Sequence, residues 1–427
     1  MDIDQMVKDS MKAPRISYDK VWQKKTQAEW KKADYNEVYT DLQKFRDTTV
    51  FNSRLQSNQL INKVTVGNDT VASATAASDA APVVHTLEVS ELASGVSKTS
   101  SGNITTGSDK TSLASQFGVT GTIEFKINGK DISIDSSKSV FELVGAINRS
   151  DSGVKANYDA TLDRFFLYST KTGAENGIDF SGSSAEGAAF LQNNLKLDTE
   201  TVMGRNAKFK LDGVELEKAG NGFSISGVTY NLKTVGTSTV SVVQDTDKIV
   251  DNIKSFVEAY NKLVDKIEGK VGEKRNRDFM PLTTDQRADM KENEIKEWEK
   301  KARSGLLQRE PALTNILNDM RNKLNDPVSG INGKYDTLAA IGIKTGAWNE
   351  GNKLNIDEEK LRQAIADDPE AVSKLFTSSG ETNAQKGVAV RLYEGLKVGL
   401  DKIALEAGRS ATTAGDNDSA LSKRIQN

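Results

Sequence analysis

Residues 239–267 read TVSVVQDTDKIVDNIKSFVEAYNKLVDKI, and the spacing of the apolar residues changes within this stretch. Val240 and Val242 alternate with polar residues, which predicts a half-buried β-strand. Beyond Asp245 the apolar residues recur at steps of four and three, which predicts a long amphipathic helix. These residues are Ile249, Ile253, Phe256, Tyr260, Leu263 and Ile267. Because Asp245 is also a favourable cap for the first turn, the chain is expected to pass here from a β-rich region into a helix-rich region.

Residues 1–48 have a second helical pattern, with a seven-residue repeat of apolar residues that is typical of a coiled coil. Lys24 and Lys31 interrupt this seam, so we expect it to be strongest from Ala28 onward. Pro14 is expected to break or start the helix. One helix cannot bury such a stripe alone, so the seam needs a partner helix from this chain or from another copy. We predict a coiled-coil or assembly face formed by Val21, Ala28, Tyr35, Val38, Leu42 and Phe45. The alternative is an ordinary helix packed within its own domain.

The middle of the chain is rich in Ser, Thr, Asn and Gly and contains short alternating patterns. The segments IEFKINGKDISID (123–135) and AKFKLDGVEL (207–216) share a hairpin pattern, with Asn128-Gly129 and Asp212-Gly213 at their turns. Such dipeptides between alternating apolar residues are strong signals for a tight two-residue turn. Residues 119–199 add a helical stretch, SSKSVFELVGAINRS, and a further hairpin. Together these elements predict a ββαββ module.

Helical patterns at both ends and β patterns in the middle predict an α+β multidomain fold. We expect a helical, partly coiled-coil leg formed by the N- and C-terminal segments, with nested β-rich head domains inserted in the middle. The predicted domains are an N-terminal coiled-coil helix (1–48), a helix-rich leg domain (49–75 plus 245–427), a β-rich head domain (76–118 plus 200–244) and a second head domain with the ββαββ module (119–199). The alternative is three domains in series.

The composition excludes several classes of function. The 57 basic and 60 acidic residues leave a formal net charge of -3, which gives no electrostatic case for binding nucleic acid or an anionic membrane surface. The absence of cysteine excludes disulfides, cysteine nucleophiles and cysteine-based zinc sites. No apolar run is long enough to span a bilayer, and no signal peptide is visible. A cytoplasmic protein and a protein exported without a cleaved signal peptide both fit these observations.

No catalytic, cofactor-binding or metal-binding motif is visible. The sequence has no G-x-x-x-x-G-K-[ST], no G-x-G-x-x-G after a strand, no H-E-x-x-H and no G-x-S-x-G. The single histidine, His85, lies on the apolar face of a predicted strand, where a half-buried packing residue is expected rather than a ligand or a base. We therefore expect a protein that is not an enzyme and that has no catalytic residue, cofactor or metal.

Several segments in order carry a family resemblance. They include DIDQMVKDSMKAP and QKKTQAEWKKADYNEVYTDLQKFRD near the N-terminus, TSTVSVVQDTDKIVDNIKSFVEAYNKLVDKI in the middle, and LAAIGIKT and LNIDEEKLRQAIADDPEAVSKLF near the C-terminus. Each motif has low specificity, but their number and order are distinctive. Over nearly its whole length, the chain resembles the flagellar filament cap proteins, also called the hook-associated protein 2 family.

The resemblance implies a non-enzymatic capping protein at the distal end of the bacterial flagellar filament that promotes flagellin folding and polymerisation. It implies a homo-oligomeric ring, commonly a pentamer, with flagellin, hook–filament junction proteins and an export chaperone as further partners, and with no nucleic acid and no membrane insertion. It also implies a secreted, extracellular protein at the flagellum tip, exported by the flagellar type III system without a cleaved signal peptide. The alternative is a surface adhesin, active in cell adhesion, or another flagellar-type structural subunit.

The chain departs from the family pattern at both ends. Members of the family begin a few residues earlier with a Ser-Gly-Leu type lead, and they continue past SALSKRIQN as a long coiled-coil helix. By this resemblance we expect the chain to be trimmed at both ends. The seam from Val21 to Phe45 would then lack its natural partner.

Overall fold

The computed structural model describes residues 3–105, 111–331, 333–346, 351–409 and 418–426, with the backbone alone for residues 3–14. The described residues form two compact units. The helical unit comprises Met1–Ile61 and Asp245–Asn427, and the inserted unit comprises Asn62–Gln244. The chain thus leaves a helical body, builds a β-rich body and returns. This order confirms the predicted nesting and excludes three domains in series.

The two chain segments that link the helical ends to the insertion are joined by backbone hydrogen bonds. Strand β1 (Asn62–Val66) pairs antiparallel with β15 (Gly236–Gln244), with the first residue of β1 opposite the last residue of β15. In the helical unit, the N–H of Asp245 donates to the carbonyl oxygen of Ile61 at 2.8 Å. The period change in the sequence at Asp245 therefore coincides with the return of the chain to the helical unit.

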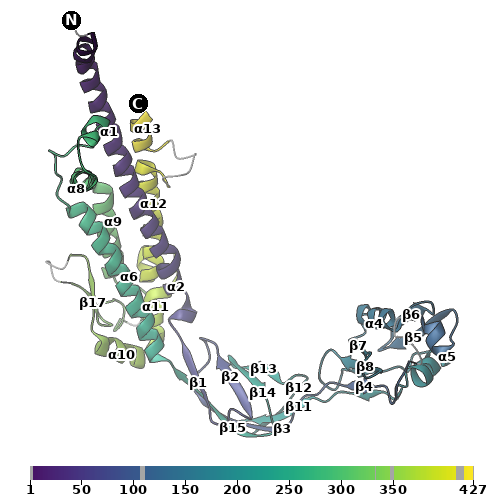
Figure 1. Ribbon diagram of the computed structural model, residues 1–427. Coiled ribbons are helices and arrows are strands. Elements are labelled where there is room, and N and C mark those ends of the chain that lie inside the picture. Colours follow the sequence, from purple (N-terminus) through teal and green to yellow (C-terminus); the bar gives the residue numbers. More distant parts are fainter. Residues whose placement is uncertain (1–2, 106–110, 332, 347–350, 410–417, 427) are drawn as a thin grey trace. The chain divides into compact units, whose positions relative to one another are not determined.

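The helical unit is built on the long helices α1, α6, α9 and α12, which lie side by side (Figure 1). Its elements are α1 (Ile3–Lys44), the π-helical turn η1 (Phe45–Val50), α2 (Phe51–Ser53), the 3-10 turn η2 (Gln56–Asn58), α6 (Thr246–Gly272), α7 (Thr284–Ala288), α8 (Glu292–Arg303), α9 (Pro311–Asn325), the antiparallel strands β16 (Ile343–Thr345) and β17 (Leu354–Ile356), α10 (Glu358–Asp367), α11 (Pro369–Thr377), the 3-10 turn η5 (Asn383–Gln385), α12 (Val388–Ala407) and α13 (Ala420–Gln426). Helices α12 and α13 contact α1, so both ends of the chain build one leg, as predicted.

The apolar faces of these helices meet in one continuous core. Helix α6 buries the stripe that its sequence predicts, from Ile249 to Ile267, and Asp245 caps its first turn by accepting a hydrogen bond from the N–H of Lys248 at 3.0 Å. The expectation for Pro14 is wrong, because α1 runs without interruption from Ile3 to Lys44. A proline lacks an N–H donor and its ring crowds the preceding turn, yet the backbone is helical on both sides of Pro14.

The first core of the inserted unit is shared by two antiparallel sheets, with strand orders β1-β15-β3-β11-β12 and β13-β14-β2. The strands not yet given bounds are β2 (Ala72–Ala76), β3 (Val84–Glu91), β11 (Ala207–Leu211), β12 (Val214–Lys218), β13 (Gly222–Ile225) and β14 (Val228–Leu232). Leu87 and Phe209 from one sheet and Tyr230 from the other are buried together. Alternating side chains on these strands face either the core or water, which is the pattern that the sequence showed.

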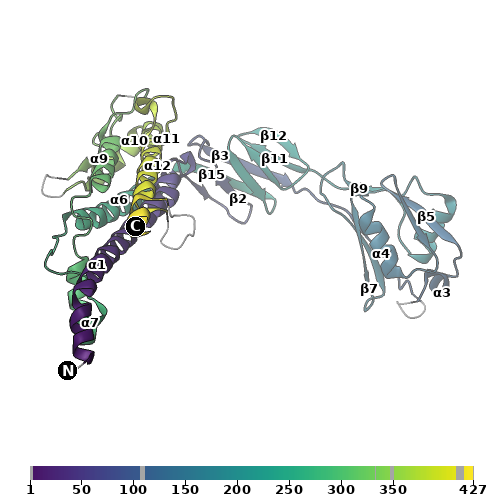
Figure 2. The ribbon, with the colours of Figure 1, turned by 90° about the horizontal axis from the view of Figure 1, so that it is seen from above.

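A second body is inserted between β3 and β11 of the inserted unit. Its elements are β4 (Ser97–Thr99), α3 (Leu113–Phe117), β5 (Thr122–Ile127), β6 (Lys130–Asp135), α4 (Val140–Arg149), β7 (Val154–Asp159), β8 (Arg164–Ser169), β9 (Gly177–Ile178), α5 (Ala185–Ala189), the π-helical turn η3 (Phe190–Asn194) and β10 (Val202–Met203). Helix α4 packs against β7 (Figure 2), and the order β5, β6, α4, β7, β8 matches the predicted ββαββ module. Ser94 and Arg205 close this insertion by exchanging two backbone hydrogen bonds of 3.0 Å.

The two similar hairpins have the same kind of turn. Asn128 and Gly129 have φ angles of 51° and 76°, and Asp212 and Gly213 have φ angles of 53° and 82°. A two-residue turn with both φ angles positive matches the twist of the flanking strands and favours Asn or Asp followed by Gly. The repeated sequence pattern therefore reflects repeated turn chemistry, and both predicted hairpins are present.

Some segments lie in other bodies than the sequence indicated. Residues 62–75, which we expected in the leg, form β1 and most of β2 in the inserted unit. Residues 96–118, which we expected in the first head domain, contribute Val96, Ile104 and Leu113 to the second core. Both segments are rich in small polar residues, so their short apolar patterns did not reveal which core they enter.

Candidate functional site on the N-terminal helix

The predicted seam on α1 has a buried part and an exposed part. The buried residues are Ala28, Tyr35, Val38, Leu42 and Phe45, whereas Val21 is 62% exposed. From Tyr35 onward the seam belongs to the core of the helical unit. The partner helices for this part are therefore α6 and α12 of the same chain. A role of the six residues in assembly between chains stays a prediction.

Aromatic packing fixes the end of the seam against α6. The ring of Phe45 lies 6.1 Å from the ring of Phe256 and 6.4 Å from the ring of Tyr260, measured between centroids. Phe256 in turn meets Phe376 of α11 edge to face at 6.0 Å. Such tilted and edge-to-face arrangements add to the gain from apolar burial, so α1 and α6 are firmly joined at this level.

Charged groups beside the seam join α1 to two other helices. The side chain of Asp34 is only 4% exposed, and its Oδ1 lies 3.1 Å from Nζ of Lys270 on α6 and 2.7 Å from a guanidinium nitrogen of Arg303 on α8. Two cations balance one buried carboxylate here, which offsets the cost of removing it from water. Asp34 thus links α1, α6 and α8.

A second ionic cluster lies one turn further along α1. Lys266 of α6 pairs with both Glu37 and Asp41, and its Nζ lies 2.7 Å from Oε1 of Glu37. The hydrogen bond from Lys266 lowers the pKa of Glu37. Burial acts to lower the pKa of Lys266, but the hydrogen bonds to Asp41 and Glu37 outweigh it and raise this pKa. Both shifts stabilise the charged forms near neutral pH.

Glu310, the residue before α9, joins α1 through a third group of contacts. Its Oε2 accepts a hydrogen bond of 2.6 Å from the hydroxyl of Tyr35, and its other oxygen pairs with Lys31. Burial, together with the hydrogen bond to Glu310, raises the pKa of the Tyr35 phenol above its ordinary value. The phenol therefore stays neutral and donates to the carboxylate.

The exposed part of α1 has fewer and more polar contacts within the chain. Gln23 donates to the carbonyl oxygen of Pro281 at 2.8 Å, and Arg15 forms an exposed ion pair with Asp285 of α7 at 2.5 Å. Three large apolar side chains of this part are exposed: Ile16, Tyr18 and Val21. This part of α1 is a candidate surface for contact with another molecule.

The single histidine has the packing role that its sequence position predicts. The ring of His85 meets the ring of Tyr230 edge to face at 6.4 Å, and its Nδ1 lies 2.6 Å from Oδ2 of Asp212. The hydrogen bond with His85 lowers the pKa of Asp212. Within the described ranges, no three or more His, Asp or Glu side chains converge in a group able to hold a metal ion. Among the described helices, none has the length and apolar character needed to cross a membrane.

The acidic partners on α1 were missed at the level of sequence, although a signal was present. Asp34 and Asp41 are seven residues apart and each directly precedes a seam residue, Tyr35 or Leu42. Charges that flank an apolar seam with the same repeat commonly form interhelical ion pairs. The cationic partners on α6 and α8 could not be identified from this spacing.

Comparisons with known proteins agree with this architecture. The family models described as "Flagellar hook-associated protein 2 N-terminus" and "Flagellar hook-associated protein 2 C-terminus" match residues 1–95 and 204–427. The crystal structure of the D1-D2-D3 domains of the flagellar cap protein FliD from Escherichia coli superposes with a TM-score of 0.64 at 22% sequence identity, covering 86% of this chain and 95% of that one. The two chains therefore share a fold.

Sequence relatives extend along most of the chain. Flagellar hook-associated protein 2 of Halalkalibacterium halodurans is 29% identical over 471 residues, covering 97% of this chain and 87% of that protein. A-type flagellar hook-associated protein 2 of Pseudomonas aeruginosa is 29% identical over 387 residues, covering 83% and 72%. The family is one of structural flagellar proteins, in agreement with the expectation that the chain is not an enzyme. By these matches at both ends, the chain belongs to the flagellar hook-associated protein 2 family.

Proposed function

We propose that this chain caps the distal end of the bacterial flagellar filament and promotes the folding and polymerisation of flagellin. Membership of the hook-associated protein 2 family is the observation that carries the proposal. The fold supports it, because a leg built from both ends of the chain with an inserted β-rich body is also the fold of the Escherichia coli cap protein.

The proposal includes a set of partners and a location. In it, copies of the chain form a ring, flagellin is the substrate, and hook–filament junction proteins and an export chaperone are met on the way to the tip. The chain is exported by the flagellar type III system and works outside the cell. The proposed role is mechanical.

The exposed part of α1 is the surface that we assign to contact with filament subunits. A cap has to hold the filament and yet move as each subunit is added, and small contacts that exchange rapidly suit this requirement. Ile16, Tyr18 and Val21 offer separate apolar contacts on a helix whose other end is fixed by the core. The buried seam and the ion pairs give the leg its stiffness.

Deletion and restoration of the gene test the proposal. A strain without the gene should export flagellin that remains unpolymerised in the medium, and the restored gene should return filaments of normal length. Filament length by electron microscopy and flagellin in the culture supernatant are the measurements. Normal filaments in the deletion strain, with loss of attachment to cells, would overturn the proposal and favour an adhesin.

A further inference from the structure

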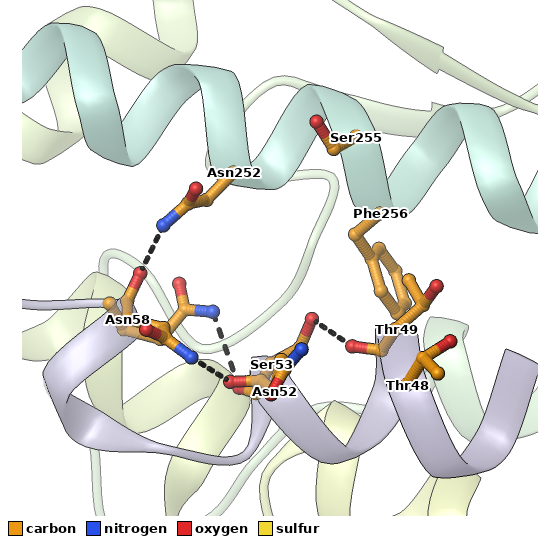
Figure 3. A pocket seen from close by; sticks show the side chains of 9 residues that line it. Thr48, Thr49, Asn52, Ser53, Asn58, Asn252, Ser255 and Phe256 are labelled. Carbon is orange, nitrogen blue, oxygen red and sulfur yellow. Dashed lines mark hydrogen bonds between the residues drawn. The ribbon is translucent and has the colours of Figure 1, made fainter.

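A polar groove in the helical unit has no part in the role described above. One end of it is a cavity of about 330 Å³ between η1, α2, η2 and α6, lined by hydroxyl and amide side chains and by Phe256. Figure 3 shows Asn252 on α6 pointing toward Asn58 across this opening, and Phe256 on the same helix extending toward Thr49. The cavity is within the range of roughly 300–1,000 Å³ that is common for ligand sites.

The groove arises where the seam on α1 ends. A seven-residue repeat continued from Leu42 would place Thr49 in the core. The π-helical turn η1 instead adds a residue to the turn, so that Val50 is buried in the core and Thr49 lines the groove. Such π-helical insertions often occur at functional sites. The shift also leaves two polar residues, Thr48 and Thr49, opposite α6.

Three amide groups in the cavity each use one of their two N–H donors internally. Asn58 donates to the carbonyl oxygen of Asn52 at 2.9 Å, Asn252 donates to that of Asn58 at 2.9 Å, and Gln59 donates to that of Ser53 at 3.2 Å. These bonds leave the side-chain carbonyl oxygens as acceptors and one N–H of each amide as a donor. Gln59 is only 3% exposed, and its Oε1 has no hydrogen-bond partner within the described part of the chain. A buried acceptor of this kind is stabilised by a donor from water or from a ligand.

The chemistry of the lining favours a neutral group that both donates and accepts hydrogen bonds. No charged side chain lines the cavity, so a bound ammonium or guanidinium group would lose its water without gaining a counter-charge. A carboxamide supplies two N–H donors for the carbonyl oxygens. Its own oxygen can accept from a hydroxyl group such as that of Thr48 or Ser255. An Asn or Gln side chain fits this set of groups.

The groove continues beyond the cavity toward a basic end. A second hollow of about 410 Å³ shares Thr48 and Thr49 with the first, and it is also lined by Lys44 and Lys262. Asp41 and Lys266 line this hollow too, and the carboxylate of Asp41 is paired with Lys266. The two exposed lysines therefore favour a carboxylate on the ligand. A ligand that fills both hollows has to be longer than one side chain.

We propose that this groove binds an extended peptide segment of a partner polypeptide. The segment places an Asn or Gln side chain in the neutral cavity and an Asp or Glu side chain beside Lys44 and Lys262. This site is separate from the exposed part of α1 assigned to filament contact.

Peptide titration of the isotopically labelled chain tests the proposal. The probes are acetylated and amidated alanine hexapeptides that carry one Gln and one Glu at each possible separation. We expect saturable shifts in the NMR signals of Thr48, Thr49 and Gln59 with at least one of them. Replacing Gln by Leu in that peptide should weaken binding roughly tenfold or more. No saturable shift with any probe, or equal binding of the Gln and Leu peptides, would overturn the proposal.

Variants of the chain give a matched control. Gln59→Leu removes the buried acceptor and should abolish the preference for Gln over Leu, whereas Gln56→Leu, on the exposed side of the same turn, should leave it unchanged. If Gln59→Leu does not fold, Ser255→Val on the surface of α6 takes its place and should weaken the Gln peptide selectively. The parent chain should bind the peptide with Glu more tightly than the same peptide with Lys in place of Glu. Lys44→Glu should reverse this preference. The titration contains only the purified chain and a synthetic peptide. Its outcome therefore does not depend on whether the chain caps the filament.

Discussion

The carboxylate of Asp34 on α1 lies 2.7 Å from the guanidinium group of Arg303 on α8, and the Asp34 side chain is almost completely buried. The same oxygen is 3.1 Å from the ammonium group of Lys270 on α6. One carboxylate therefore joins three helices that are distant in sequence. An apolar seam alone would leave the rotation of α1 about its axis weakly defined, and this contact fixes it.

Replacing Asp34 by Ala should destabilise the helical unit by roughly 2 kcal/mol, because charge-assisted hydrogen bonds in a buried position are lost. Thermal or urea unfolding followed by circular dichroism measures the change. The control is Asp285→Ala, which removes the exposed ion pair with Arg15 and should cost roughly 0.5 kcal/mol or less. Equal losses of unfolding free energy in the two variants would show that the buried ion pairs of Asp34 stabilise the chain no more than an exposed ion pair does.

The sequence predicts elements well where one local pattern decides them. The stripe from Ile249 to Ile267 specifies α6, and Asn128-Gly129 specifies a hairpin turn, because each signal is complete within a few residues. The pairing of Asp34 with Arg303 depends on residues 269 positions apart, so no local pattern contains it. The π-helical turn is an intermediate case, since the polar Thr49 at a seam position was visible but the compensating burial of Val50 was not.

The cap of α6 gives a second prediction. Asp245 accepts a hydrogen bond from the N–H of Lys248, at the point where the chain returns to the helical unit. Asp245→Ala should destabilise the helical unit by about 1 kcal/mol, the usual cost of losing an N-cap. Asp251→Ala, an exposed position six residues later on the same helix, is the control and should have little effect. The denaturant midpoint of both variants measures the difference.

Close packing of α9 on α12 gives a third prediction. A Cβ atom at Gly399 would lie 3.0 Å and 3.3 Å from two side-chain carbons of Ile316, which is itself buried. Gly399→Val should therefore cost roughly 2 kcal/mol through overpacking. At Gly395 the added Cβ would meet the ends of two flexible side chains, those of Lys323 and Asp319. Gly395→Ala should stay within about 1 kcal/mol of the parent chain, because helix propensity offsets the displacement. Melting temperatures that fall equally for both variants would contradict this distinction.

The cluster around Lys266 gives a fourth prediction, on pH. The pKa of Glu37 is lowered in the folded chain, so its stabilising effect is present above the ordinary value of 4.5 and is lost as the pH falls through the lowered pKa. The pKa of Lys266 is raised, so its effect is present below 10.5 and is lost as the pH rises through the raised pKa. The free energy of unfolding, measured across pH, should fall at both the acidic and the basic end. Lys266→Met should make both decreases smaller. A pH profile that this substitution leaves unchanged would assign the dependence to other groups.

Val21 and Leu42 occupy the same position of the seven-residue repeat, yet Val21 is 62% exposed and Leu42 is fully buried. This difference separates the two roles that the seam was predicted to have. Leu42→Asp would place a carboxylate in the core of the helical unit and should unfold it, because a buried charge without a partner is costly. Val21→Asp places the same group in water and should leave the unfolding curve unchanged.

The two variants therefore give different readouts in a strain that lacks its own copy of the gene. Val21→Asp should shorten filaments while the purified chain stays folded, if the exposed part of α1 contacts the filament. Leu42→Asp should abolish filaments and remove most of the helical signal in circular dichroism, while the β-rich inserted unit keeps its own cores. Val243→Asp, an exposed valine of β15, is the matched control for surface charge. Normal filaments with Val21→Asp would confine the seam to folding the leg, and the contact with the filament would then have to be sought on another face.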